Sequence, residues 1–178
     1  MYKGSNTFRC FPIYDPANTL TVLCNDHSTT GITMIKVCIQ IEAGSCDRRI
    51  YNEKTLEYKE TRRMPLPCPY AYGFILDTKA ADGDNLDCYL ITREKLKSGT
   101  IVACEPIGLL EQYEGDEVDF KVLATLPGEE VQVNQKLHQE LEEFIHAIFS
   151  GFPDVMLCVG PILPSQAALD HVQANRLV

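Results

Sequence analysis

The stretch DGDNLDCYLI, residues 82–91, places three aspartates within six positions and then continues as an apolar run. Its first four residues favour a turn, and Leu86 to Ile91 is typical of a buried strand. Unpaired carboxylates this close repel one another by about 4 kcal/mol per pair at a surface-like dielectric. The stretch is therefore either a solvated acidic turn or a place where cations bind.

Carboxylate oxygens at the open end of a strand suit Mg²⁺, which keeps several of its waters and needs few protein ligands. An EF-hand calcium loop is excluded, because Leu86 and Asp87 stand where that loop needs its fifth ligand and its glycine. Arg93 also replaces the bidentate glutamate that such a loop requires. A solvated acidic turn stays open as the alternative from this stretch alone.

The rest of the chain reads as mostly strands followed by two helices. Strands are predicted at 35–41, where Ile35, Val37, Ile39 and Ile41 alternate with other residues, and at 55–61, 86–91, 100–105, 118–124 and 155–159. A helix is predicted from the N-cap Asn134 to Gly151, and a last one opens at Pro164. This order predicts an α+β fold that is mainly β, a small barrel with two C-terminal helices packed outside.

The length of 178 residues suits a single domain over residues 1–178. A formal net charge of −9 without a basic stripe argues against nucleic acid as a partner. No apolar run approaches the length of a membrane span, and the N-terminus lacks a signal-peptide core, so we expect no membrane partner and a cytoplasmic location. Eight scattered cysteines without a C-x-x-C pair argue against zinc, and Cys38, Cys88, Cys104 and Cys158 are predicted to be buried.

A second acidic motif, EGDEVDFKV at residues 114–122, follows the first. Val118, Phe120 and Val122 alternate with Glu117, Asp119 and Lys121, so one face of a strand is apolar and the other is charged. An amphipathic edge strand with surface ion pairs would account for this pattern alone. An edge strand would not explain why this charged strand occurs together with the acidic cluster at residues 82–87.

With both motifs in place, the sequence resembles the soluble inorganic pyrophosphatases of family I. The signature D-G-D-x-x-D is matched by residues 82–87, and D-E-G-E-x-D-x-K is matched loosely by EGDEVDFK. PYAYGFI at 69–75 is similar to the family's Y-x-x-N-Y-G-F-I segment, and VCIQIEAGS to its V-x-I-E-I-P-A-x-S strand. The resemblance covers about residues 35–172, which leaves residues 1–30 as a diverged N-terminal extension.

The resemblance implies a five-stranded OB-like barrel with flanking strands, assembled as a homo-oligomer (a hexamer or dimer). It implies hydrolysis of inorganic diphosphate with several Mg²⁺ ions per active site, for which Mn²⁺ substitutes. Asp82, Asp87, Asp119 and Glu114 would bind metal, and Asp84 would be the general base. Lys121, Tyr72, Arg49 and Arg62 or Arg63 would bind phosphate, with Lys121 counted among the catalytic residues.

Several positions depart from the family pattern. Gln40 and Tyr51 stand where metal-side glutamates are expected, Cys68 replaces a tyrosine, and Arg49 replaces a lysine. Ile148 and Phe149 replace the Tyr-Lys pair that serves the outgoing phosphate. Two interpretations therefore stay open: a working diphosphatase, or a diverged relative that binds metal and phosphate with weak or altered phosphohydrolase activity or acts as a non-catalytic interaction subunit.

Overall fold

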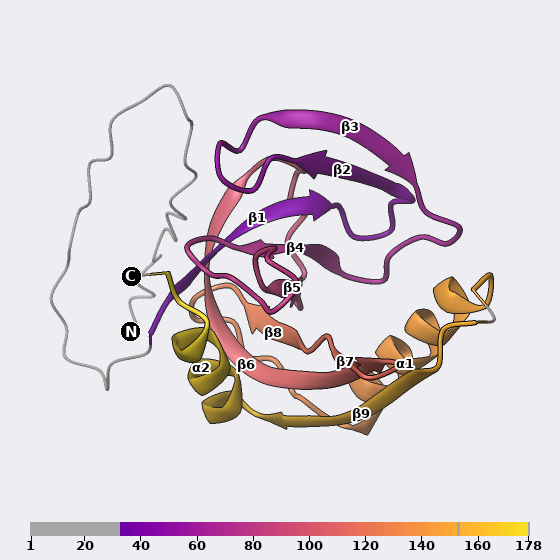
Figure 1. Cartoon of the computed structure of the whole chain (residues 1–178). Helices are drawn as coiled ribbons and strands as arrows, with labels where there is room; N and C mark the ends of the chain where they lie inside the picture. Colours follow the sequence, from indigo (N-terminus) through magenta and orange to yellow (C-terminus); the bar gives the residue numbers. More distant parts are fainter. Residues whose placement is uncertain (1–32, 153, 178) are drawn as a thin grey trace, which may run out of the picture.

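A computed structural model describes residues 33–152 and 154–177 of the chain, and Figure 1 shows their path. Five strands close into a barrel in the order β1 (Ile35–Ile41), β4 (Ala71–Ile75), β5 (Asp87–Leu90), β8 (Lys121–Thr125) and β6 (Ile101–Glu114), and β6 pairs back to β1. Neighbouring strands are antiparallel except β5 and β8, which run parallel. The closed ring confirms the predicted barrel; the predicted extension at 1–30 lies outside the described residues.

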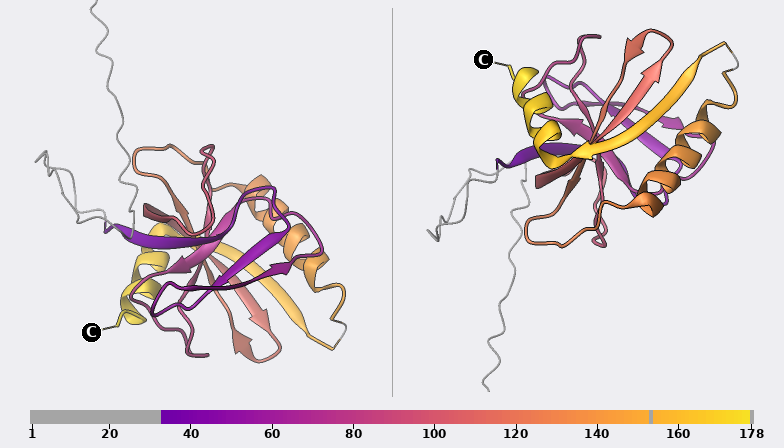
Figure 2. Two further views of the ribbon diagram at one scale, coloured as in Figure 1. Left: turned by 90° about the horizontal axis from the view of Figure 1, so that it is seen from above. Right: turned by 90° about the horizontal axis from the view of Figure 1, so that it is seen from below.

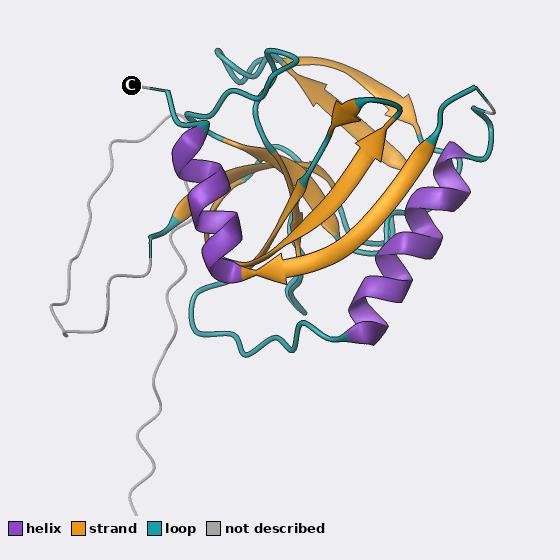
Figure 3. Ribbon diagram, turned by 60° about the horizontal axis from the view of Figure 1, so that its bottom comes forward, coloured by secondary structure: helices purple, strands orange, loops and turns teal. Residues whose placement is uncertain are grey.

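Four strands and two helices surround this ring. β7 (Glu117–Val118) and β9 (Leu157–Pro164) both pair with β6, whereas β2 (Asp47–Tyr51) and β3 (Tyr58–Arg63) form a separate two-stranded sheet beside β1 (Figure 1). The helices α1 (Gln135–Phe149) and α2 (Ser165–Ala174) pack on the outside of the barrel, well apart from each other (Figures 2 and 3). Among the described residues, no helix has the length and apolar character that a bilayer span requires.

The two helices close two apolar clusters. Ala168 and Val172 of α2 join the barrel interior, and Leu141 and Ile145 of α1 join a second cluster beside it. The side chain of Asn134 caps α1 by accepting a hydrogen bond from the Leu137 amide at 3.1 Å, as the sequence predicts. Each large aliphatic side chain buried in this way contributes about 1.5–3 kcal/mol.

Gly73 in the middle of β4 allows the close approach of β1. A Cβ atom at this position would overlap the carbonyl oxygen of Cys38, so only glycine fits between the two strands. Its neighbours Tyr72 and Phe74 pair with Tyr89 and Asp87 across the β4–β5 ladder. The close packing of β1 on β4 therefore sets where Tyr72 and Asp87 lie.

Several details of the predicted elements are wrong, among them the strand predicted at 155–159, which is β9 at Leu157–Pro164. The strand predicted at 100–105 continues to residue 114, because a shift in register near Pro106 and Gly108 lets it bend instead of ending. The strand predicted at 118–124 is interrupted at residues 119–120, and that predicted at 55–61 begins only at Tyr58, after Leu56 in a positive-φ turn. Cys158 is exposed on β9, whose strand partner is β6.

Candidate functional site

The DGDN turn is organised by its own backbone. Gly83 adopts φ +96°, and the amide of Asp84 donates to Oδ1 of Asp82 at 3.0 Å. The carbonyl of Asp84 accepts from the amide of Ala80 at 2.7 Å, which closes the turn. Asp82 and Asp84 are exposed, and Asp87 follows as the first residue of β5. The turn thus delivers its carboxylates to one end of the barrel.

The second acidic motif arrives at the same end, because β5 and β8 run parallel with Cys88 opposite Val122. Lys121, the first residue of β8, is buried, and its Nζ lies 2.5 Å from Oδ2 of Asp87 and 2.6 Å from Oδ2 of Asp119. One ammonium group therefore joins the two predicted motifs.

Gln112 binds the other side of this cluster. Its Nε2 donates to Glu114 at 2.9 Å and to Asp119 at 3.2 Å, while its Oε1, buried, has no partner among the described residues. Gln112 is not among the predicted site residues. The sequence gives only a weak signal for Gln112, because it is a single amide residue two positions before the second acidic motif.

The carboxylates of both motifs surround an acidic basin, a cavity of about 660 Å³. Its lining includes eight carboxylates and one guanidinium, that of Arg48; the carboxylates are Glu53, Asp82, Asp84, Asp87, Glu114, Asp116, Glu117 and Asp119. All five predicted carboxylate residues lie in it: Asp82, Asp84, Asp87, Glu114 and Asp119. The structure therefore brings together the predicted metal-ligand set and the predicted general base.

The electrostatics reflect this crowding. Burial, together with the charge of Asp87 and hydrogen bonding to Glu114, outweighs Lys121 and raises the pKa of Asp119 to about 6. Burial and then the charges of Asp84 and Asp87 raise the pKa of Glu53, despite a 2.6 Å hydrogen bond from the Asn85 amide. Burial alone would lower the pKa of Lys121, but Asp87 and Asp119 raise it above its ordinary value.

A second, smaller cavity of about 210 Å³ adjoins the basin and shares Arg48, Asp87, Glu114 and Asp119 with it. We call it the clamp cavity. Tyr72 and Lys121, both predicted to bind phosphate, line its polar side. Burial, then the charge of Asp87, raises the pKa of Tyr72 well above its ordinary value, so its phenol stays protonated. Cys68, Ile148 and Phe149 also line it, at the departures from the family pattern.

The guanidinium of the clamp cavity comes from Arg48 and not from the predicted Arg49. Arg48 donates to Oε1 of Gln40 at 3.1 Å, and its guanidinium carbon lies 5.5 Å from the centre of the Tyr72 ring. Arg49 is exposed and lines neither cavity. Successive side chains of a strand point to opposite faces, so one position decides which arginine enters the site. The half-buried Ile50 shares the face of Arg48, and the register shift between Ile50 and Tyr51 takes the buried Tyr51 out of this alternation.

The predicted Arg62 and Arg63 are likewise not brought into the site. Both are exposed on β3, where Arg62 pairs with Glu60 at 2.5 Å and Arg63 with Asp47 at 2.8 Å. They belong to the outer strand of the β2–β3 sheet, which β2 separates from the barrel (Figure 1). Arg48 of β2 and Glu53, in the turn after β2, are the residues of this hairpin that line the basin.

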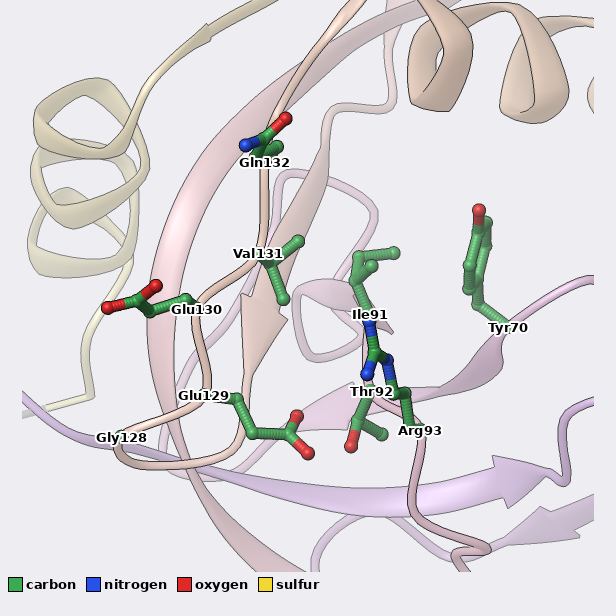
Figure 4. A pocket seen from close by; sticks show the side chains of 9 residues that line it. All are labelled: Tyr70, Ile91, Thr92, Arg93, Gly128, Glu129, Glu130, Val131 and Gln132. Carbon is green, nitrogen blue, oxygen red and sulfur yellow. The ribbon is translucent and has the colours of Figure 1, made fainter.

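A further pocket of about 770 Å³ lies away from both cavities, between Tyr70, residues 91–93 and the loop 128–132 (Figure 4). Its charged groups are few: Glu130 points away from Arg93, and Glu129 points toward Thr92 (Figure 4). Tyr70 donates to Glu140 at 2.5 Å, and Glu129 accepts from Thr125 at 3.2 Å. This pocket therefore lacks the set of concentrated charges that the basin has.

The donor chemistry of the basin fits divalent cations. Oxygen donors in excess of positive charge are what Mg²⁺ and similar ions select. The Oε1 of Gln112, which has no partner among the described residues, lines the adjoining clamp cavity. Within residues 33–152 and 154–177, however, no three carboxylate, imidazole or thiol groups already surround a single point. The ammonium of Lys121 lies between Asp87 and Asp119, where it provides an internal positive charge.

Comparison with known proteins agrees with the two acidic motifs. Curated inorganic pyrophosphatases from Nostoc sp. and Haemophilus influenzae are 37% and 36% identical over 94 and 92 residues. Each alignment covers 51% of this chain, and the chain matches only about half of each relative's length (55% and 52%).

Solved structures show the same fold. The inorganic pyrophosphatase from Thermus thermophilus has a TM-score of 0.72 and 25% identity, covering 80% of this chain and 88% of that one. The enzyme from Coxiella burnetii has a TM-score of 0.73 and 23% identity, covering 84% and 97%. The family model of inorganic pyrophosphatase matches residues 33–152, which include both acidic motifs and the whole of the closed barrel. The chain therefore belongs to the inorganic pyrophosphatase family.

Proposed function

We propose that this chain hydrolyses the phosphoric anhydride of inorganic diphosphate with Mg²⁺, for which Mn²⁺ substitutes. The observation that carries the proposal is a basin of eight carboxylates that opens onto Lys121, Arg48 and Tyr72. Carboxylates for cations and protonated donors for phosphate oxygens are both needed to bind a substrate with three to four negative charges. Family membership adds independent support.

Divalent ions bound by Asp82, Asp87, Asp119 and Glu114 would neutralise the crowded carboxylates and lower the pKa of a bound water toward neutrality. Asp84 lies at the exposed rim of the basin, where it can accept the proton of the attacking water. Lys121 and Tyr72 stay protonated, so both can donate hydrogen bonds to phosphate oxygens. Arg48 adds a guanidinium at the boundary between the basin and the clamp cavity.

The alternative is a relative that binds metal and phosphate but turns over diphosphate weakly. One observation favours it: Ile148 and Phe149 line the clamp cavity with apolar atoms and donate nothing to a phosphate. Residues 1–178 as one domain, a homo-oligomer and a cytoplasmic location stay predictions; light scattering of the purified full chain would test the oligomer.

The proposal is tested by phosphate release from inorganic diphosphate with Mg²⁺ and with a chelator. We expect release with Mg²⁺ and a loss of about 10²- to 10⁴-fold in Asp84→Asn, whose amide cannot accept the water's proton. Asp170→Asn, at an exposed aspartate of α2, is the matched control and should react as the parent does. Failure of the parent to release phosphate would contradict the proposal, and full activity of Asp84→Asn would remove Asp84 from the mechanism.

A further inference from the structure

The clamp cavity has two chemically different sides. Lys121, Arg48 and Tyr72 lie on the side of the basin, whereas the opposite side is formed by Met64 and by four residues of α1: Phe144, Ile145, Ile148 and Phe149. The α1 residues recur at helical spacing, so they form one continuous apolar wall. A ligand that fills the cavity must therefore be charged at one end and apolar at the other.

The cavity offers little positive charge to an anion, because its lining also holds the carboxylates of Asp87, Glu114 and Asp119. Arg48 and Lys121 are the cations in its lining, and Lys121 already contacts two carboxylates. Among the described residues, Nε of Arg48 is buried without a hydrogen-bond partner, which leaves a donor for an anion. The apolar wall offers no other charged contact for a second set of phosphate oxygens.

The same lining restricts the leaving group. The wall that would face the ester group, Met64 and the four α1 residues, contains no acid that could protonate a leaving alkoxide. A leaving alkoxide would need protonation, whereas a phosphate leaves as a stable anion. The cavity therefore favours cleavage of a P–O–P anhydride over cleavage of a simple phosphate ester.

We propose that the preferred substrate is an organic diphosphate with a compact apolar ester group, its terminal phosphoryl in the acidic basin, its inner phosphate at Arg48 and its ester group against α1. This inference rests on the proposed hydrolytic function and names its substrate class. The cavity volume of about 210 Å³ is below the roughly 300–1,000 Å³ of most ligand pockets. It thus fits a short branched chain or a single ring.

The reaction balances without a further reactant. The oxygen of water bonds to the terminal phosphorus as the bridging P–O bond breaks, and the proton of the water passes to Asp84. The bond's electron pair leaves with the organic monophosphate. Phosphate and organic monophosphate are the two products.

The test compares kcat/KM for 3-methylbut-3-enyl diphosphate, methyl diphosphate and inorganic diphosphate with Mg²⁺. We expect the five-carbon ester to exceed the other two by at least roughly tenfold, the usual gain from filling an apolar pocket. The double variant Ile148→Tyr, Phe149→Lys should reverse this order, because it adds two donors for a free phosphate. Ala147→Lys, exposed on the same helix, adds the same charge outside the cavity and should keep the parental order.

Calorimetry separates this inference from the hydrolytic function. The probes are methylenediphosphonate and its 3-methylbut-3-enyl ester, which are not hydrolysed. Tighter binding of the ester to the parent, without turnover of any substrate, would refute hydrolysis and support the assigned ligand class. Equal or tighter binding of methylenediphosphonate to the parent would overturn the inference, as would a double variant that folds but keeps the parental order. If the double variant does not fold, the order of kcat/KM among the three diphosphates in the parent protein decides whether the inference stands.

Discussion

Lys121 joins the two acidic motifs, so its removal measures how strongly they repel. Lys121→Met keeps the length of the side chain but leaves Asp87 and Asp119 without their shared cation. Both carboxylate oxygens contact the same nitrogen, at 2.5 and 2.6 Å, so they lie within about 5 Å of each other. At an effective dielectric of about 20, two charges at that distance repel by about 3 kcal/mol. We expect the free energy of unfolding to fall by that amount in the absence of metal.

Urea unfolding with a chelator at pH 7.5 measures this loss. Mg²⁺ should restore part of it, because an external cation then takes the place of the ammonium. The loss should also shrink at pH 5, since Asp119, whose pKa is already raised to about 6, takes up a proton first. Lys136→Met is the control: Lys136 is exposed and lies 3.7 Å from Glu140, a pair worth about 0.5 kcal/mol or less. A loss below 1 kcal/mol for Lys121→Met, or one equal to that of the control, would refute the reasoning.

Arg48→Met should raise the KM for diphosphate by about 10- to 100-fold through loss of a charge-assisted contact, whereas Arg49→Met should leave it unchanged; equal effects in steady-state kinetics would contradict the assignment of Arg48. Burial lowers the pKa of His171, so below about pH 6.5 the unfolded chain binds a proton that the folded chain resists, and the free energy of unfolding decreases as the pH is lowered. His171→Phe should reduce this decrease between pH 7.5 and pH 5, measured by urea unfolding. Gly73→Ala should lower stability by several kcal/mol because its methyl group would overlap the Cys38 carbonyl, and a melting temperature within 2 °C of the parent would be at odds with the packing of β4 on β1.

The barrel and the acidic basin could be predicted from the sequence because they depend on local patterns. Asp82, Asp84 and Asp87 lie within one turn and strand, and Asp119 precedes Lys121 by two residues, so their spacing survives small errors in the strand limits. The parallel pairing of β5 and β8, which brings the two motifs together, is not written in either motif. The two motifs are expected at one end of a barrel only because the resemblance to the inorganic pyrophosphatases implies that barrel.

The residues of the β2–β3 sheet could not be placed in this way. Whether Arg48 or Arg49 faces the site depends on the length of the turn after β1, and a shift of one residue exchanges the two faces. β1 shows the same limit: Gln40 alternates with the isoleucines, as an exposed residue would, yet it is buried. Cys38 packs against Tyr51 and Phe74, a contact between elements that no periodicity reveals.

The β2–β3 sheet also affects local unfolding of the molecule. It consists of two strands apart from the barrel, every residue of β3 is exposed, and Tyr51 is the buried residue of β2. Two-stranded hairpins are marginal by themselves, so this unit can open at lower free energy than the barrel, as a separate cooperative segment. Its β3 amides would then exchange with deuterium sooner than those of β4 and β8. Each opening would also withdraw Arg48, so the time this hairpin spends closed limits the fraction of molecules able to hold a phosphate.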